Sequence, residues 1–291
     1  MKGILLVNHF YKSEGFSSVF KRLEEASLSL GIAVEQRTTL DFFVPLGEPV
    51  KEDFDFVLFW DKDIALARRL ENTQIPVFNS AEVIALCDDK AASAMRFADW
   101  NLPMPQTLLS PFTYSNVGMT DLFFVEEAAK SLGLPFVIKE TFGSFGAQVY
   151  LVHTVEEAKA TVAAISPRPF LMQAFVASSF GKDIRVNVVG GRVVAAMERR
   201  GREGDFRSNI GAGGTGRAVS LSPSEEELAL SAADAVGADF AGVDLLTGAD
   251  GEPLLCEINS NPHFLGTEKY CGVDMAKEIL SHVARKVKEG N

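Results

Sequence analysis

Short apolar runs alternate with amphipathic segments along the first 85 residues. Four runs are rich in β-branched or aromatic side chains and are predicted to be strands: residues 1–8, 32–37, 54–60 and 75–79. Residues 20–31 and 64–73 carry apolar side chains at helical spacing and are predicted to be helices. Strands that alternate with helices predict a parallel α/β unit over residues 1–85. This unit has no GxGxxG motif after its first strand, which disfavours dinucleotide binding there.

The pattern changes after residue 80. Residues 80–100 form one long helical pattern, which should end at Pro103 and Pro105 because proline cannot continue a helix. Residues 110–120 resemble a loop. The chain then predicts, in order, a helix, a strand, a glycine-rich turn, a strand and a second helix: residues 123–133, 135–140, 141–148, 149–153 and from 154 onward.

A third unit begins near Phe170. Gly190 and Gly191 separate two β-rich runs and predict a hairpin. Residues 222–237 predict a helix, with a serine cap, a proline at its first position and a glycine at its end. Residues 241–259 predict a second hairpin that turns at Ala-Asp-Gly.

Composition narrows the possible functions. The chain has 291 residues, enough for two domains or for one domain with a lobed insertion. Its net charge of −11 argues against non-specific nucleic-acid binding, which needs a positive surface. The three cysteines are widely spaced and form no zinc-binding or disulfide pattern. The N-terminal apolar run is too short for a signal peptide and no membrane-spanning stretch occurs, so a cytoplasmic location is expected.

The hairpin at residues 241–259 carries polar residues in an apolar strand. Side chains alternate between faces, so Glu257 and Asn259 should share one face with Leu255, while Cys256 and Ile258 face the other way. Asp244 lies on the preceding strand, and two carboxylates about 4 Å apart repel by roughly 4 kcal/mol at an effective dielectric near 20. Oxygen ligands around such a pair suit Mg²⁺ or Mn²⁺. The alternative is a pair of solvated hairpin residues that never meet.

Other charged residues favour a phosphate-binding role. Asp183 and Arg185 alternate onto one face, and arginine can grip phosphate or carboxylate with two hydrogen bonds; a surface salt bridge is the simpler interpretation of this pair. Lys139 precedes a turn containing Gly143 and Gly146, which could fold over a polyphosphate or be a plain hairpin turn. Lys90, taken alone, is most simply a solvated helix lysine.

The order of these motifs resembles the ATP-grasp ligases, and most closely the RimK-type branch, which adds glutamate to protein or peptide ends. The motifs, over residues 80–285, are LPMPQT, VIKETFGSFGAQVYLV, GKDIRVNVVGGRVVAAMERR, EGDFRSN, AGVDLL and CEINSNP. The resemblance implies an α/β ATP-grasp fold with α+β lobes. It divides the chain into an N-terminal parallel α/β pre-ATP-grasp domain (1–88), a small central lobe (89–172) and a C-terminal lobe with the metal site (173–291).

The resemblance also implies roles for individual residues. For ATP these are Lys90 and Lys139 at the phosphates, Gly143, Ser144 and Gly146 in the covering turn, Gln173, Ala174, Phe175 and Val176 at adenine, and Asp183, Arg207, Ser208 and Asn209 elsewhere in the nucleotide pocket. Two Mg²⁺ (or Mn²⁺) ions would be held by Asp244, Glu257 and Asn259. Arg207 and Asn209 would stabilise an acyl phosphate, and Arg200, or Arg199 beside it, would hold a substrate carboxylate.

The implied activity joins a carboxylate to an amine with ATP as the phosphoryl donor. The partners would be ATP, a carboxylate donor and an amine acceptor such as an amino acid, a peptide or a protein end, with no nucleic acid or membrane; similar enzymes are often homo-oligomers. Two departures from the family pattern stand out: IGAGGTG replaces a basic residue and GG after RSN, and Ala174 replaces a common acidic residue. The alternatives are a free dipeptide ligase of the D-alanine–D-alanine type and a non-catalytic ATP-binding protein.

Overall fold

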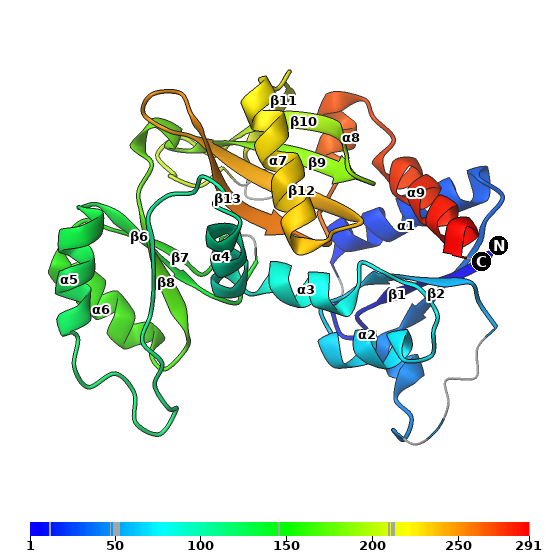
Figure 1. Cartoon of the computed structure of the whole chain (residues 1–291), viewed down its shortest axis with the longest axis horizontal. Coiled ribbons are helices and arrows are strands. Elements are labelled where there is room, and N and C mark those ends of the chain that lie inside the picture. Colours follow the sequence, from blue (N-terminus) through cyan, green and yellow to red (C-terminus); the bar gives the residue numbers. More distant parts are fainter. Residues whose placement is uncertain are drawn as a thin grey trace.

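The N-terminal part of the chain forms a parallel sheet covered by helices. A computed structural model of the protein describes residues 1–11, 13–46, 48, 53–144, 146–208, 210 and 213–290. The strand order in this first sheet is β2-β1-β3-β4, and every neighbouring pair is parallel, which confirms the expected α/β unit (Figure 1). Its elements are β1 (Lys2–Val7), α1 (Glu14–Ser29), β2 (Ala33–Thr38), η1 (Thr39–Phe42), β3 (Phe56–Trp60), α2 (Ile64–Glu71) and β4 (Val77–Phe78).

The long helical pattern after residue 80 is two helices, not one. α3 (Ala81–Asp88) is followed by Asp89, whose extended backbone interrupts the helical pattern. The Asp89 side chain then accepts hydrogen bonds from the amides of Ala91 and Ala92 and so caps α4 (Lys90–Asp99). The break places Lys90 at the first position of α4 instead of on a solvated helix face.

The central part of the chain forms a four-stranded antiparallel sheet in the order β5-β8-β6-β7. Two helices cover one face of this sheet, and their apolar side chains share a core with β6 and β8. The boundary expected between residues 172 and 173 falls inside β8. The elements are β5 (Thr107–Leu109), α5 (Phe123–Leu132), β6 (Phe136–Glu140), β7 (Val149–Val152), α6 (Val155–Ile165) and β8 (Phe170–Ala174).

The third sheet has the order β11-β10-β9-β12-β13 and is antiparallel. Gly190 and Gly191 turn its first hairpin with positive φ angles, as predicted. Gly237 ends α7 in the left-handed conformation, also as predicted. The elements are η2 (Ala177–Ser179), β9 (Lys182–Val189), β10 (Arg192–Arg200), β11 (Thr215–Ala218), α7 (Pro223–Val236), β12 (Phe240–Thr247), β13 (Pro253–Asn259), α8 (Leu265–Cys271) and α9 (Met275–Gly290).

The predicted alternation along β13 is wrong at one point. The register with β12 shifts between Asp244 and Leu245, so β13 carries one extra residue, Cys256. Leu255 and Ile258 therefore lie in the same hydrophobic core, instead of on opposite faces. Glu257 and Asn259 still share a face, because both follow the bulge.

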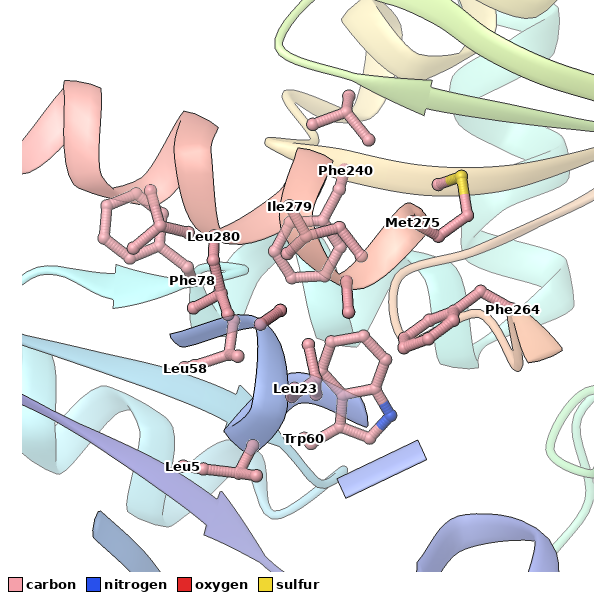
Figure 2. Packing of buried hydrophobic residues seen from close by; sticks show 14 of the residues in the cluster. Leu5, Leu23, Leu58, Trp60, Phe78, Phe240, Phe264, Met275, Ile279 and Leu280 are labelled. Carbon is pink, nitrogen blue, oxygen red and sulfur yellow. The ribbon is translucent and has the colours of Figure 1, made fainter. Parts of the chain in front are cut away.

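The C-terminal helix returns to the N-terminal domain. α9 packs against α1 (Figure 1). Trp60 of β3, Phe240 of β12 and Ile279 of α9 meet in one core, so the first and third sheets are joined by apolar packing (Figure 2). The Trp60 and Phe240 rings are stacked, with centroids 5.6 Å apart. Among the helices that the structure describes, none combines the length and apolar character needed to cross a bilayer.

Candidate active site

The buried Lys139 and the half-buried Lys90 lie close together between the second and third sheets. Lys139 on β6 donates a 2.7 Å hydrogen bond from Nζ to Gln173 Oε1 on β8. Lys90 at the start of α4 donates from Nζ to the carbonyl oxygen of Gly143 at 2.9 Å. Both lysines line a cavity with Glu257. Burial lowers the pKa of Lys90, an effect that Glu257 opposes and Lys139 reinforces.

These two cations give the cavity the charge that a polyphosphate requires. Lys90 uses one donor within the protein, and Lys139 uses a second donor in a long 3.8 Å contact with Cys256 Sγ. Each ammonium group has three N–H donors, so both lysines keep at least one for a phosphate. The helix break at Asp89 and the backbone hydrogen bond from Lys90 N to Thr141 O (3.0 Å) hold Lys90 beside the glycine-rich turn. The positions of Lys90 and Lys139 are therefore compatible with the expected role of both side chains at the phosphates.

The glycine-rich turn contacts Lys90 through Gly143 and Lys62 through Ser144. Gly146 has a φ of +72°, and a Cβ there would lie 3.0 Å from Arg207 Cδ, so a side chain would disturb both the backbone and the arginine. Ser144 accepts a 3.1 Å hydrogen bond from Lys62 Nζ, and Lys62 also forms an ion pair with Asp88. Lys62 follows β3 in the N-terminal domain, and no sequence motif indicated a role for it.

A buried ionic network crosses the third sheet. Arg199 Nε donates to Asp183 Oδ1 at 2.7 Å, and Arg185 Nη2 donates to Asp244 Oδ2 at 2.8 Å. Arg199 Nη2 also lies 2.8 Å from Asp244 Oδ2. Ser208 donates its hydroxyl to Asp183 Oδ2. The simple interpretation of Asp183 and Arg185 as a surface salt bridge is wrong, because both side chains are buried and each pairs with a different strand.

The network shifts the pKa values of Asp183 and Asp244 in opposite directions. Burial opposes the charge on Asp244, but Arg185 and Arg199 outweigh burial and lower the pKa of Asp244 to about 2. Burial raises the pKa of Asp183, and the nearby Asp244 charge adds to that rise, while Arg199 opposes it. Of the two groups, Asp244 is therefore the one whose charged form the network stabilises more strongly.

Glu257 lines the same cavity, and Asn259 lies beside it on β13. Asn259 Nδ2 donates to Glu257 Oε1 at 3.2 Å, which leaves Asn259 Oδ1 and Glu257 Oε2 available to a cation. Asp244 is the cross-strand neighbour of Glu257, as predicted, yet both its oxygens are occupied by guanidinium groups. Within the described residues, no group of three His, Cys, Asp or Glu side chains could by itself hold a metal. Glu257 and Asn259 thus fit a Mg²⁺ ion, whereas Asp244 fits one only if it releases its arginines.

Arg207 and Arg200 lie in different surroundings. Arg207 Nη2 donates to the carbonyl of Val149 at 2.6 Å, and the guanidinium lies 4.7 Å from the centre of the Phe206 ring. Arg207 therefore joins the third sheet to β7, next to the glycine-rich turn. Asn209, expected to act with Arg207, lies outside the described residues.

Arg200 does not reach the buried network. Its side chain is 59% exposed and bonds Glu198 at 2.7 Å. The neighbouring Arg199 has the inward position. The alternating pattern alone could not distinguish these two, and the role of Arg200 stays a prediction.

The segment expected at adenine links the second sheet to the third. Gln173 accepts the hydrogen bond from Lys139 and donates one of 2.8 Å from its Nε2 to Thr107 Oγ1. Ala174 ends β8 and its amide donates to the carbonyl of Gln106 at 2.9 Å. Phe175 packs edge-on against Phe206, and the backbone passes through Val176 into the 3-10 helix η2. The segment thus connects the lysine cavity to the arginine-bearing loop.

Curated proteins of several organisms are similar to this chain. A curated protein of Parasynechococcus marenigrum, named "Probable alpha-L-glutamate ligase", is 37% identical over 225 residues, which are 77% of this chain and 46% of that protein. The human beta-citrylglutamate synthase B is 34% identical over 235 residues, which are 79% of this chain and 58% of that protein. The match thus spans about half the length of these curated relatives.

Solved structures share the fold. The ATP-grasp ligase PsnB, complexed with a precursor variant, Mg and ADP, has a TM-score of 0.74 at 19% identity, covering 98% of each chain. The ATP complex of D-alanine–D-alanine ligase from Bacillus anthracis has a TM-score of 0.75 at 18% identity, covering 100% of each chain. The sequence model of the RimK-like ATP-grasp domain matches residues 87–283, and this chain therefore belongs to the RimK-like ATP-grasp family.

Proposed function

We propose that this chain is an ATP-dependent carboxylate–amine ligase that forms an amide bond through an acyl phosphate. The observation that carries this proposal is the convergence of Lys90, Lys139 and Glu257 on one cavity between two antiparallel sheets, with Asn259 hydrogen-bonded to Glu257. Cations for the phosphates and oxygen ligands for Mg²⁺ are the two requirements of phosphoryl transfer from ATP. Membership of the RimK-like ATP-grasp family supports the same chemistry.

The reaction has two balanced steps. An oxygen of the substrate carboxylate attacks the γ-phosphorus of ATP, the bond from that phosphorus to the bridging oxygen breaks, and ADP leaves. The amine then attacks the carbonyl carbon of the acyl phosphate, loses a proton, and inorganic phosphate leaves as the amide forms. Such chemistry depends mainly on positioning and on neutralising charge, so a nucleophilic side chain is unnecessary.

The side chains take complementary roles in this proposal. Lys90 and Lys139 bind the phosphates, and the turn that contains Ser144 covers them. Mg²⁺ held by Glu257 and Asn259 would neutralise charge on the phosphates, with Asp244 as a third ligand once its arginines move. Arg207 stabilises the acyl phosphate together with Asn209. Arg200, exposed at the end of β10, meets a carboxylate that arrives from solvent.

We propose L-glutamate as the first amine substrate to test. The names of the relatives share a glutamyl group: alpha-L-glutamate ligase, beta-citrylglutamate synthase and N-acetylaspartylglutamate synthase. The carboxylate partner would be an amino acid, a peptide or a protein end. The cytoplasmic location and the homo-oligomeric state remain predictions.

One observation favours a second candidate, nucleotide binding without phosphoryl transfer. Asp244 holds two guanidinium groups where a metal ligand is expected. If these ion pairs persist when nucleotide binds, the metal site has only Glu257 and Asn259, and phosphoryl transfer is impaired.

Turnover measurements distinguish the two candidates. Purified protein is incubated with ATP, Mg²⁺, L-glutamate and pools of amino acids, peptides and small carboxylic acids, and ADP, phosphate and product masses are recorded. A ligase releases ADP and phosphate in equal amounts. The mass of its product equals the summed mass of its two substrates minus one water. A free dipeptide as product would indicate the D-alanine–D-alanine type of activity. Nucleotide binding without phosphate release from any pool would reject the ligase proposal.

A further inference from the structure

Lys62, in the link between β3 and α2, places a third lysine beside the glycine-rich turn. Its Nζ donates a 3.1 Å hydrogen bond to Ser144 Oγ and forms an ion pair with Asp88, the last residue of α3. The adjacent turn residue, Gly143, accepts a hydrogen bond from Lys90. Two consecutive residues of the turn are therefore held by lysines from two different segments of the chain.

The backbone that carries Lys62 is held on both sides. Asp61 Oδ1 accepts hydrogen bonds from the amides of Lys62 (2.5 Å) and Asp63 (3.1 Å), and Asp63 caps α2. Asn261, after β13, donates from Nδ2 to the carbonyl of Asp61 at 3.0 Å. The Asn8 side chain also forms a hydrogen bond with the Asp61 carboxylate. The side chain of Lys62 therefore starts from a backbone that three separate segments hold in place.

The charge of Lys62 adds to the positive charge of the lysine cavity. Burial lowers the pKa of Lys90 most, and the charges of Lys139 and Lys62 lower it further, so each of these lysines repels Lys90. Glu257 and Asp88 oppose this effect. Like charges held this close together favour a bound anion, and a polyphosphate would supply one beside the turn.

An ion pair with Asp88 alone is the simpler interpretation of Lys62. Water reaches both side chains, since Lys62 is 46% exposed and Asp88 is 20% exposed. Such a pair contributes little to stability, so it does not explain why Lys62 also donates to the turn. Lys62 moreover precedes the RimK-like domain at residues 87–283, so its contact with the turn is a contribution of the N-terminal domain.

Ser144 keeps a hydrogen-bond donor of its own. Because Lys62 Nζ donates to Ser144 Oγ, the hydroxyl proton points elsewhere, and within the described part of the chain it has no acceptor. A hydroxyl that accepts from a cation becomes a stronger donor, since hydrogen bonds in a chain polarise one another. The free O–H of Ser144 thus suits an anionic oxygen next to the ammonium group of Lys90.

We propose that Lys62 is a positioning residue for ATP, which orients the Ser144 hydroxyl to donate to a terminal phosphate of the nucleotide. The N-terminal domain then takes part in phosphate binding through a residue that contacts the turn and not the nucleotide. This inference rests on the proposed ligase function and adds Lys62 to its nucleotide site.

Binding measurements on the full chain test the proposal without turnover. Calorimetry in the presence of Mg²⁺ gives the affinities for a non-hydrolysable β,γ-imido analogue of ATP and for AMP, which lacks the terminal phosphates. The proteins compared are wild type, Lys62→Met, Ser144→Ala, the double variant and Lys21→Met. Lys21 is the matched control, an exposed lysine of α1 that pairs with Glu25 at 3.9 Å. Urea denaturation without nucleotide checks that each protein is folded.

Lys62→Met should bind the ATP analogue at least about tenfold more weakly than the wild type, with its affinity for AMP unchanged within about twofold. Ser144→Ala should show a similar loss. The double variant should lose no more than about twofold beyond either single variant, because Lys62 acts through Ser144. Lys21→Met should match the wild type with both ligands.

An unchanged affinity of Lys62→Met for the analogue overturns the proposal, as does an equal loss for AMP, which would indicate a structural role only. Losses that add in the double variant overturn it too, because Lys62 would then act without Ser144. Lys62-dependent analogue binding by a wild type that releases no phosphate from ATP would reject the ligase function and leave this role of Lys62 intact. Turnover by the wild type with unchanged analogue binding in Lys62→Met would reject only the role of Lys62.

Discussion

Arg199 reaches from β10 across β9 to Asp244 on β12, with Nη2 2.8 Å from Oδ2. The same guanidinium bonds Asp183, so one arginine neutralises two buried carboxylates. Arg185 shares the charge of Asp244 but forms no ion pair with Asp183 within the described part of the network. The ion pairs of Arg199 therefore link β10 to both β9 and β12.

Replacing Arg199 by methionine should destabilise the protein by about 3 kcal/mol or more, because Asp183 then loses its partner in the core. Urea denaturation of the two proteins measures this change. Arg192→Met is the matched control on the same strand: Arg192 is 60% exposed and pairs with Glu278, so its loss should cost no more than about 1 kcal/mol. Equal effects of the two substitutions would mean that the buried network adds nothing to stability.

The register of β9 and β10 explains why the sequence could predict which residues form the buried ionic network but not which of them pair with one another. The alternating pattern correctly placed Asp183 and Arg185 on one face of β9. The glycine turn alone would set Asp183 opposite Glu198, but the register shifts between Val193 and Ala195 and sets it opposite Arg199. This bulge turns Arg199 inward and Arg200 outward. A bulge in an apolar run has no residue signature, so the choice between the two arginines required the structure.

The predictions that rested on local chemistry agree with the structure more closely. The hairpin glycines, the cap of α7 and the parallel first sheet depend on nearby residues, and the sequence contains them. The contacts of Lys62 and Asp61 could not be predicted in this way, because their partners come from distant segments of the sequence. Lys62 contacts Ser144, and Asp61 contacts Asn261, across 82 and 200 residues of sequence.

Lys139 should be required for nucleotide binding if the proposed function holds. Lys139→Met removes a buried charge that lies beside Gln173 and faces the cavity, and kcat/KM should fall by roughly 10²–10³-fold. ADP and phosphate release at several ATP concentrations gives this ratio. Lys130→Met removes an exposed lysine of the same lobe, which pairs with Glu127, and should leave the ratio unchanged. Full activity in Lys139→Met would remove this lysine from the phosphate site.

Glu257 should determine how much Mg²⁺ the protein needs. Glu257→Gln loses the charged oxygen that Asn259 orients, so half-maximal phosphate release should require at least about tenfold more Mg²⁺. A Mg²⁺ titration at saturating ATP measures the shift. Glu252→Gln changes a carboxylate at the turn of the same hairpin and serves as the control. An unchanged Mg²⁺ requirement in Glu257→Gln would exclude Glu257 as a ligand.

The Glu198 carboxylate should make stability depend on pH in the acid range. Arg217, followed by Arg200, outweighs the effect of burial and lowers the pKa of Glu198 to about 2. Because the folded pKa lies below the unfolded value, this stabilisation is complete above about pH 4.5 and is lost as the pH falls towards 2. Between pH 5 and pH 3 the wild type should lose more stability than Glu198→Gln in urea titrations. Parallel losses in the two proteins would show that the carboxylate is not selectively stabilised.

Asn79 should hold the first sheet against the third. Its buried side chain donates 2.8 Å hydrogen bonds to the carbonyls of Phe240 and Ser260 and accepts one of 2.8 Å from the amide of Asp239. Asn79→Ala leaves these backbone groups without partners in the core, so the free energy of unfolding should fall by about 3 kcal/mol or more. Urea denaturation measures the change, with the exposed Asn72→Ala expected to stay within about 0.5 kcal/mol of wild type. A variant as stable as the wild type would mean that these three hydrogen bonds contribute nothing to folding.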